Sequence, residues 1–219
     1  TQFMPSNYLR YAVDGDGDGR INLWRSERDA LASGARFLRD LGWVPALRWG
    51  REVRLPAEFR YELALSGEAL PLAEWARLGV MRSDGAALPT AELQASLLVP
   101  AGASGPAFLV YDNFDVIMRW NRSESYALSV GHLADRIAGA GPLQQAPPAS
   151  QQPLARADVL ALQQGLNALG FDAGAEDGLF GSGTRAALSR FQRSVGVVAD
   201  GYPSAEIQQR LQEVARGSP

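Results

Sequence analysis

Three aspartates alternate with three glycines in the stretch Asp14-Gly15-Asp16-Gly17-Asp18-Gly19, which Arg20-Ile21-Asn22 follow. The alternation lets the three carboxylates converge when the chain curls, and Gly19 permits the sharp turn that this curl requires. Calcium takes roughly six to eight oxygen ligands, and carboxylates gathered without a cation repel one another. The stretch therefore predicts an EF-hand-like calcium loop between two helices.

The other ligands of this loop follow from the same pattern. Arg20 offers its backbone carbonyl, and Asn22 can reach an ion through water. The twelfth position, where such loops carry a bidentate glutamate, is Arg25 here. We predict Asp29 in its place, because a lengthened loop can bring it round; a solvated Asp-Gly turn without an ion is the alternative. The predicted ligands are Asp14, Asp16, Asp18, Arg20 and Asp29.

Working outward from the loop, residues 1–43 read as helix, loop and helix. The second helix is indicated by apolar or small residues at spacings of three and four, and Gly42 is placed to end it. These residues are Ala30, Leu31, Gly34, Phe37, Leu38 and Leu41. Residues 44–120 instead contain short strand-like runs at 52–56, 95–99 and 107–111, the last two as a plausible hairpin, and residues 123–138 return to helix.

The composition changes at residues 144–153, which are rich in Gln and Pro and indicate a linker. Beyond it, apolar stripes predict three helices with two Asp-Gly turns between them. The stripes are Val159, Leu162, Leu166 and Leu169; Ala187, Leu188 and Phe191 after Thr184; and Ile207 with Leu211. We predict domains at 1–143 and 154–215, joined by this linker.

The bulk composition excludes several classes of function. The chain of 219 residues has a net charge of -3 and no basic block, so nucleic acid is not an expected partner. It has no Cys and one His, His132, so it has almost none of the Cys and His ligands that zinc sites use and lacks the thiol that a Cys-His dyad needs. No apolar run approaches the ~20 residues that span a bilayer.

Residues 108–126 are rich in aromatic, amide and arginine side chains, the groups that proteins use to bind sugars. We interpret Phe108, Phe114, Val116 and Ile117 as ordinary core. For Trp120, Asn121 and Tyr126, composition leaves core and sugar contact equally open.

Several stretches, taken in order, resemble a known family. They are Gln2-Phe3-Met4-Pro5-Ser6, Tyr11-Ala12-Val13-Asp14, Ile21-Asn22-Leu23-Trp24, Asp29-Ala30-Leu31-Ala32-Ser33, Gly42-Trp43, Val110-Tyr111-Asp112-Asn113-Phe114, Arg119-Trp120-Asn121-Arg122-Ser123 and the helix 126–135. Residues 1 to about 143 resemble family B lytic murein transglycosylases. Residues 154–213 are similar to a three-helix peptidoglycan-binding domain through Leu162-Gln163, Asp177-Gly178-Leu179-Phe180-Gly181, Phe191-Gln192 and Asp200-Gly201.

This resemblance implies an α+β, mainly α fold: part of a lysozyme-like transglycosylase domain with an EF-hand-like loop and a small β-sheet, then a three-helix peptidoglycan-binding domain. It also implies cleavage of the β-1,4 bond between MurNAc and GlcNAc without water. The muramyl 6-hydroxyl attacks the anomeric carbon, leaving a 1,6-anhydro ring, and one glutamate acts as acid and then base. A purely peptidoglycan-binding protein is the alternative.

The family's catalytic glutamate lies upstream of the Gln2–Ser6 motif, so no residue of this chain is expected to be the acid. The resemblance carries over substrate-binding positions at Gln2, Trp120, Asn121 and Tyr126. It implies peptidoglycan glycan strands and stem peptides as partners, structural calcium and no organic cofactor. It further implies a monomer in the periplasm or cell envelope of a Gram-negative bacterium, with possible outer-membrane association of the parent protein.

Overall fold

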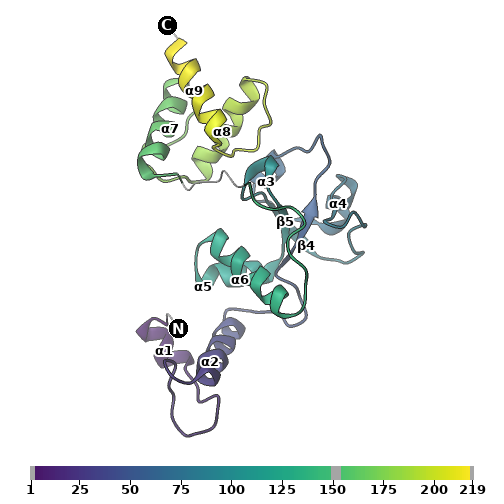
Figure 1. The fold of residues 1–219 in the computed structure, drawn as a ribbon, viewed down its shortest axis with the longest axis vertical. Helices are drawn as coiled ribbons and strands as arrows, with labels where there is room; N and C mark the ends of the chain where they lie inside the picture. Colours follow the sequence, from purple (N-terminus) through teal and green to yellow (C-terminus); the bar gives the residue numbers. More distant parts are fainter. Residues whose placement is uncertain (1–2, 149–153, 218–219) are drawn as a thin grey trace. The chain divides into compact units, whose positions relative to one another are not determined.

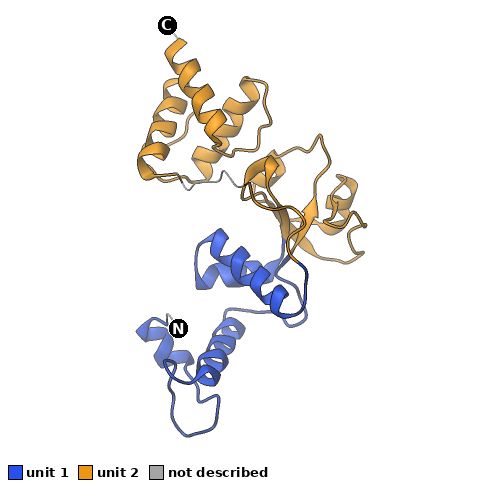
Figure 2. Cartoon of the chain, viewed as in Figure 1, with its two compact units in different colours: residues 1–50, 110–141 blue, residues 51–109, 142–219 orange. Residues whose placement is uncertain are grey.

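The computed structural model describes residues 3–148 and 154–217, which form two compact units (Figures 1 and 2). Unit 1 combines residues 1–50 with 110–141, and unit 2 combines residues 51–109 with 142–219. Both are mainly helical, and a small curled sheet lies in the first part of unit 2. The expected fold class is therefore confirmed. None of the described helices is long and apolar enough to cross a membrane.

Unit 1 contains four helices. They are α1 (Pro5–Tyr11), α2 (Glu27–Asp40), α5 (Asp112–Trp120) and α6 (Glu124–Ile137). The side chains of Ser26 and Ser123 cap α2 and α6 by accepting from the backbone N–H three residues on, which satisfies a donor that a helix start leaves unpaired. The predicted helix-loop-helix and the helix at 123–138 are confirmed.

Helix α2 buries only part of the face that was expected, including Phe37. Leu31, placed in the predicted apolar stripe, is 74% exposed, whereas the polar Asp29 and Ser33 are buried. The Ser33 hydroxyl accepts from the Val13 backbone N–H at 2.9 Å, and Asp29 accepts from two further backbone groups of the loop. The inward face of α2 is therefore partly polar because it holds the loop.

A buried amide fixes the turn that follows α2. The Asn113 side chain is 0% exposed; it accepts from the Val44 backbone N–H at 2.8 Å and donates to the carbonyls of Val44 and Leu47. Three hydrogen bonds to one turn make Asn113 the clamp between α5 and residues 44–47. No helix was predicted at α5, although Phe114, Val116 and Ile117 are buried core as expected.

The sheet of unit 2 has five short strands in the order β2-β4-β5-β1-β3. They are β1 (Gly50–Arg54), β2 (Leu70–Pro71), β3 (Met81–Arg82), β4 (Gln94–Leu98) and β5 (Ala107–Val110). β1, β4 and β5 lie where strands were predicted, and β4 and β5 are neighbours as a hairpin would require. Short helices α3 (Glu62–Leu65) and α4 (Leu72–Arg77) and the 3₁₀ turn Gly102–Ser104 fill the connections.

The three-helix module of unit 2 consists of α7 (Arg156–Ala168), α8 (Ser182–Ser194) and α9 (Ala205–Gly217). Its core gathers the predicted apolar stripes, with Phe171 edge-on to Phe191 at 5.5 Å between ring centroids. The fully or nearly buried members are Leu162, Leu166, Ala173, Ala187, Leu188, Phe191, Ile207 and Leu211. The three predicted helices are confirmed, and α8 begins two residues before Thr184.

One arrangement of polar groups occurs twice in this module. The buried Gln163 accepts from the Gly178 backbone N–H at 2.8 Å and donates to Asp177 at 3.0 Å. The buried Gln192 accepts from the Gly201 N–H at 2.7 Å and donates to Asp200 at 2.7 Å. Each Asp-Gly turn is thus held by one glutamine from the preceding helix, which makes the module an internal repeat.

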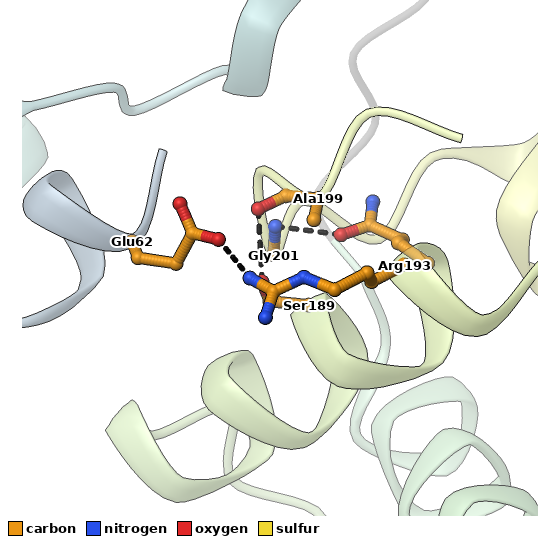
Figure 3. A network of polar contacts seen from close by, with 6 residues as sticks. Glu62, Ser189, Arg193, Ala199 and Gly201 are labelled. Carbon is orange, nitrogen blue, oxygen red and sulfur yellow. Dashed lines mark hydrogen bonds and ion pairs between the residues drawn. The ribbon is translucent and has the colours of Figure 1, made fainter. Parts of the chain in front are cut away.

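The second Asp-Gly turn also contacts the sheet region of unit 2. Asp200 Oδ2 accepts from the Ala103 backbone N–H at 2.8 Å, and a side chain at Gly102 would meet Tyr202 Cβ at 2.6 Å. Arg193 forms an ion pair with Glu62 of α3, with Gly201 close by (Figure 3). The module and the sheet region therefore pack together within unit 2.

Only the first part of the predicted linker falls within the described residues. The backbone N–H groups of Gln144 and Gln145 both donate to the Glu52 carboxylate at 2.8 Å. Residues 149–153 of that segment lie outside the described residues. The predicted domain boundaries at 143 and 154 stay predictions.

Candidate functional site

The acidic loop of unit 1 brings together three of its predicted ligands. One carboxylate oxygen from each of Asp14, Asp16 and Asp18 lies within 4.8 Å of the others, and all three residues are exposed. The Asp14 carboxylate accepts from the backbone N–H of Gly17 at 2.6 Å and of Gly19 at 2.8 Å. The loop is therefore curled by its first carboxylate, so that the next two face the same space.

Gly17 and Gly19 make this curl possible. Their φ angles are 79° and 83°, in the left-handed region that residues with a side chain rarely adopt. The Arg20 backbone N–H donates to Asp18 at 2.8 Å. This bond ties the backbone of Arg20, the predicted carbonyl ligand, to the third carboxylate.

Asp29 contacts the loop but lies outside the group of three converging carboxylates. It is 1% exposed, and its two oxygens accept from the N–H groups of Gly15 at 2.8 Å and Asn22 at 2.7 Å. Those two bonds, with that of Asn22 the stronger influence, hold the pKa of Asp29 below its ordinary value despite burial. Asp29 is thus a charged anchor that fixes both ends of the loop.

Hydrogen bonds from Gly19 and Gly17 likewise lower the pKa of Asp14. A serine then joins the loop to α2: the Ser26 hydroxyl donates to Asp16 at 2.6 Å and accepts from the Asp29 N–H at 3.2 Å. The loop therefore carries ionised carboxylates on a frame tied to the first turn of α2. Such a set of oxygen donors fits a hard divalent cation.

A second feature of unit 1 is an apolar cavity of about 330 Å³ with aromatic walls. Its lining comes from the end of α2, the turn after it, the end of α5 and one face of α6. The lining residues are Leu38, Trp43, Trp49, Ile117, Trp120, Tyr126, Val130, Gly131 and Ala134. Two residues predicted to contact substrate, Trp120 and Tyr126, are therefore brought to one cavity.

Trp120 is held in place by other rings. Its ring centroid lies 4.8 Å from that of Phe37 and 5.6 Å from that of Phe3, and its edge lies 3.6 Å from the point where Gly34 would carry a Cβ. Phe37 in turn stacks on Tyr11 at 4.6 Å. This packing leaves Trp120 half-buried, with part of its ring available in the cavity.

Trp49 forms another wall of the cavity and was not among the predicted site residues. Its indole N–H donates to Asp135 at 3.0 Å, and any side chain at Gly131 would overlap its ring. Gly131 therefore lets α6 approach the indole closely. The glycine one turn after the buried Ala127, on the same face of α6, was the available signal, but the sequence does not show which ring it meets.

The other two residues predicted to contact substrate are Asn121 and Gln2. Asn121 is exposed directly after α5, beside Trp120 in the chain but outside the cavity lining. Tyr126 is 37% exposed in the first turn of α6. Gln2 lies outside the described residues. The single histidine, His132, is half-buried on α6 and is not part of the lining.

Comparison with known proteins places both parts of the chain in families. Residues 1–135 match the transglycosylase SLT domain, and residues 155–212 match a peptidoglycan binding domain. The structure of SltB3 from Pseudomonas aeruginosa in complex with NAG-anhNAM-pentapeptide is 47% identical, with a TM-score of 0.90. The similarity covers 97% of this chain and 57% of SltB3.

A second SltB3 structure, in complex with NAG-NAM-pentapeptide, gives the same TM-score of 0.90 over 96% of this chain. Membrane-bound lytic murein transglycosylase B of Escherichia coli (strain K12) is 35% identical over 144 residues, which are 63% of this chain and 37% of that protein. The chain thus spans little more than half of SltB3 and just over a third of the E. coli protein. Since the first match covers residues 1–135 of 219, the chain belongs to the transglycosylase SLT domain family.

Proposed function

We propose that the chain is part of a lytic transglycosylase of peptidoglycan, which cleaves the MurNAc-β-1,4-GlcNAc bond without water and leaves 1,6-anhydromuropeptides. The observation that carries this proposal is the 47% identity and TM-score of 0.90 with SltB3 over 97% of the chain. The SltB3 structure is a complex with NAG-anhNAM-pentapeptide, in which the muramyl residue is an anhydro sugar. An anhydro sugar is the product that this reaction gives.

In this proposal the aromatic cavity of unit 1 holds part of the glycan. Flat rings cover the apolar face of a pyranose, and amides bond its hydroxyls. Trp120 and Tyr126 supply the rings and Asn121 the amide. Gln2 is proposed as a further contact because it belongs to the same family motif.

We propose that this chain binds the glycan without supplying the catalytic acid. Proton transfer to the leaving oxygen needs an acid within hydrogen-bond reach of it. Among the described residues, the cavity that contains Trp120 and Tyr126 has no carboxylate in its lining. The glutamate is expected before Gln2 in the family's order of motifs. A second carboxylate is not needed, because the nucleophile is the substrate's own 6-hydroxyl.

The proposed domain boundaries are 1–143 for the transglycosylase portion and 154–215 for the peptidoglycan-binding domain, with a linker at 144–153. The family matches at 1–135 and 155–212 support them. The three-helix module then targets the enzyme to the wall. We place the parent protein in the periplasm of a Gram-negative bacterium, as a monomer with outer-membrane association.

We propose calcium as the ion of the acidic loop. Asp14, Asp16 and Asp18 would hold it by their converging oxygens, Arg20 by its carbonyl, and Asp29 as the charge that closes the loop. The fit rests on three carboxylates within 4.8 Å of one another, a donor set that repels itself without a cation. A bound divalent ion would neutralise that repulsion and stabilise unit 1.

Digestion of purified sacculi followed by mass spectrometry tests the proposed division of labour. The chain should pellet with sacculi and release no 1,6-anhydromuropeptides. Trp120→Ala should weaken binding of glycan chains stripped of peptide, whereas Trp24→Ala should not, since Trp24 is 75% exposed and outside the cavity. Anhydro products that disappear when one of the chain's own glutamates is changed would show that the acid is misplaced.

The same cavity without a carboxylate also favours the alternative of a purely wall-binding protein. The two differ when the chain is mixed with the separately expressed amino-terminal part of a family member. Release of anhydro products by the mixture supports the enzyme, and continued binding without release by a folded mixture supports the binding protein.

A further inference from the structure

A cavity of about 430 Å³ in unit 2 is lined by both Asp-Gly turns of the three-helix module. One wall is Gly178, Leu179 and Phe180, and the facing wall includes Gly201 and Tyr202. Val99 and Pro100 of the sheet region complete the lining, with Leu154, Arg156, Val159, Arg185, Asp200 and Pro203. Its volume is that of an ordinary small-ligand site, and it combines apolar walls with two guanidinium groups.

The two arginines occupy equivalent places in the internal repeat. The aliphatic stem of Arg156 packs against the Gly178 turn, and that of Arg185 packs against the Gly201 turn, so closely that neither glycine has room for a side chain. Arg156 uses two of its donors on the Asp177 carbonyl, at 2.9 and 3.1 Å. Its guanidinium therefore completes the first turn.

Arg185 does not repeat this bond. Within the described residues its guanidinium donates to no oxygen; it lies over the Phe180 ring at 5.8 Å from the centroid, in the cavity lining. Arg185 is half-buried and its stem is fixed by the turn. A cation that is positioned by packing and carries several unused donors is suited to an anionic ligand.

The acidic groups nearby are already engaged. Asp200 accepts from Gln192 and the Tyr202 N–H through Oδ1, and from the Ala103 N–H through Oδ2. Asp177 accepts from Gln163 and the Leu179 N–H. Asp200 thus uses both oxygens on the turn and the sheet region, and Asp177 is not part of the cavity lining. Within the described residues neither carboxylate accepts from Arg185, so its donors are left to a ligand.

We propose that this cavity binds the carboxylate-ended peptide of peptidoglycan, with Arg185 receiving the carboxylate and the apolar walls receiving its small side chains. A planar guanidinium matches a carboxylate by two parallel hydrogen bonds. Leu179, which is 62% exposed, and Tyr202 offer surface for the alanine methyl groups. The inference rests on the proposed function and assigns one binding step to a defined site.

Titration of the whole chain with diacetyl-Lys-D-Ala-D-Ala, followed by NMR, tests this site. Amide shifts should concentrate at residues 178–180, 185 and 201–202. Arg185→Gln should weaken binding about tenfold or more, as loss of a charge-assisted pair implies. Arg185→Lys should recover part of it, and Arg216→Gln, outside the cavity, should leave it unchanged. The carboxamide form of the peptide should bind as weakly to the natural chain as the acid form binds to Arg185→Gln.

Equal binding of acid and carboxamide, no binding of either, or shifts elsewhere in a folded chain would overturn the assignment. Circular dichroism of Arg185→Gln confirms that the module is intact. Pelleting with intact sacculi and with bead-coupled glycan strands from amidase-stripped sacculi separates this inference from the proposed function. A chain that pellets with both equally binds the wall through glycan and refutes only the peptide site, whereas a chain that pellets with neither refutes the wall-binding function itself.

Discussion

The replacement Gln163→Leu isolates the contribution of one buried amide to the three-helix module. Gln163 is 1% exposed and makes four hydrogen bonds, to Asp177, Leu179, Thr184 and the Gly178 N–H. Leucine has nearly the same volume, so the change removes the hydrogen bonds and leaves the packing. We expect the module to lose stability although an apolar residue has entered its core.

The size of the loss follows from which partners are buried. The bond from the Gly178 N–H and the bond to the Thr184 hydroxyl oxygen are fully buried, and a buried donor or acceptor left unpaired costs about 1–3 kcal/mol. The two partly buried bonds contribute about 0.5–1.5 kcal/mol each, and leucine burial returns some of the total. A net loss of about 2–4 kcal/mol is expected. For a module of this size that lowers the melting temperature by roughly 10–25 °C.

Calorimetry of the whole chain measures the transition, and hydrogen exchange at the Gly178 amide reports the local opening. Gln164→Leu is the matched control, because Gln164 is the next residue of α7 and is exposed. Its effect should stay within about 0.5 kcal/mol. Equal melting shifts for the two variants, or unchanged exchange at Gly178 in Gln163→Leu, would refute the reasoning.

Three further perturbations test other parts of the structure. A chelator should lower the melting temperature of unit 1 and leave that of the three-helix module unchanged. At a hundredfold excess of calcium over its Kd, the ion stabilises the folded unit by about 2.7 kcal/mol, which the chelator removes. A chelator effect that persists in Asp16→Ala would count against the loop as the calcium site. Gly131→Ala should destabilise unit 1 by about 1–3 kcal/mol and shift Trp49 fluorescence, because its methyl group overlaps that ring, whereas Gly141→Ala, with open space around it, should be neutral. The hydrogen bond from Gln163 is the main cause that lowers the pKa of Asp177. The stabilisation from ionised Asp177 is therefore present above the ordinary Asp pKa and is lost as the pH falls through the lowered pKa. Acid unfolding of the module should become less pH-dependent in Asp177→Asn, and an unchanged acid transition would contradict this.

Periodicity was sufficient for the elements whose apolar residues face one core. The stripes of α7, α8 and α9 predicted their helices because each buries one face against the others. It misjudged α2, where Leu31 is exposed while Asp29 and Ser33 point inward. Hydrogen bonds to the loop determine which face of α2 points inward, and the spacing of apolar residues carries no information about hydrogen bonds.

Only those parts of the site whose residues are close together in the sequence could be predicted. Asp14, Asp16 and Asp18 converge because alternation and glycine turns are local properties of the chain. The aromatic cavity depends on Trp49 meeting Gly131, residues far apart in the sequence that no short pattern connects. Helix α5 was missed for a related reason: Asn113 is buried through bonds to residues 44–47, and a polar residue there gives no apolar signal.

The two halves of the internal repeat differ in the length of chain that they tolerate. Fourteen residues separate Gln163 from Asp177, but eight separate Gln192 from Asp200, and both pairs close the same hydrogen-bonded turn. The same turn is therefore closed at two different spacings between the glutamine and the Asp-Gly pair. The extra length of the first half is nevertheless not spare chain, because Ala173 is buried in the module's core and its N–H donates to Asn167 at 2.6 Å. Shortening this stretch to the length of the second half should therefore remove a residue from the core.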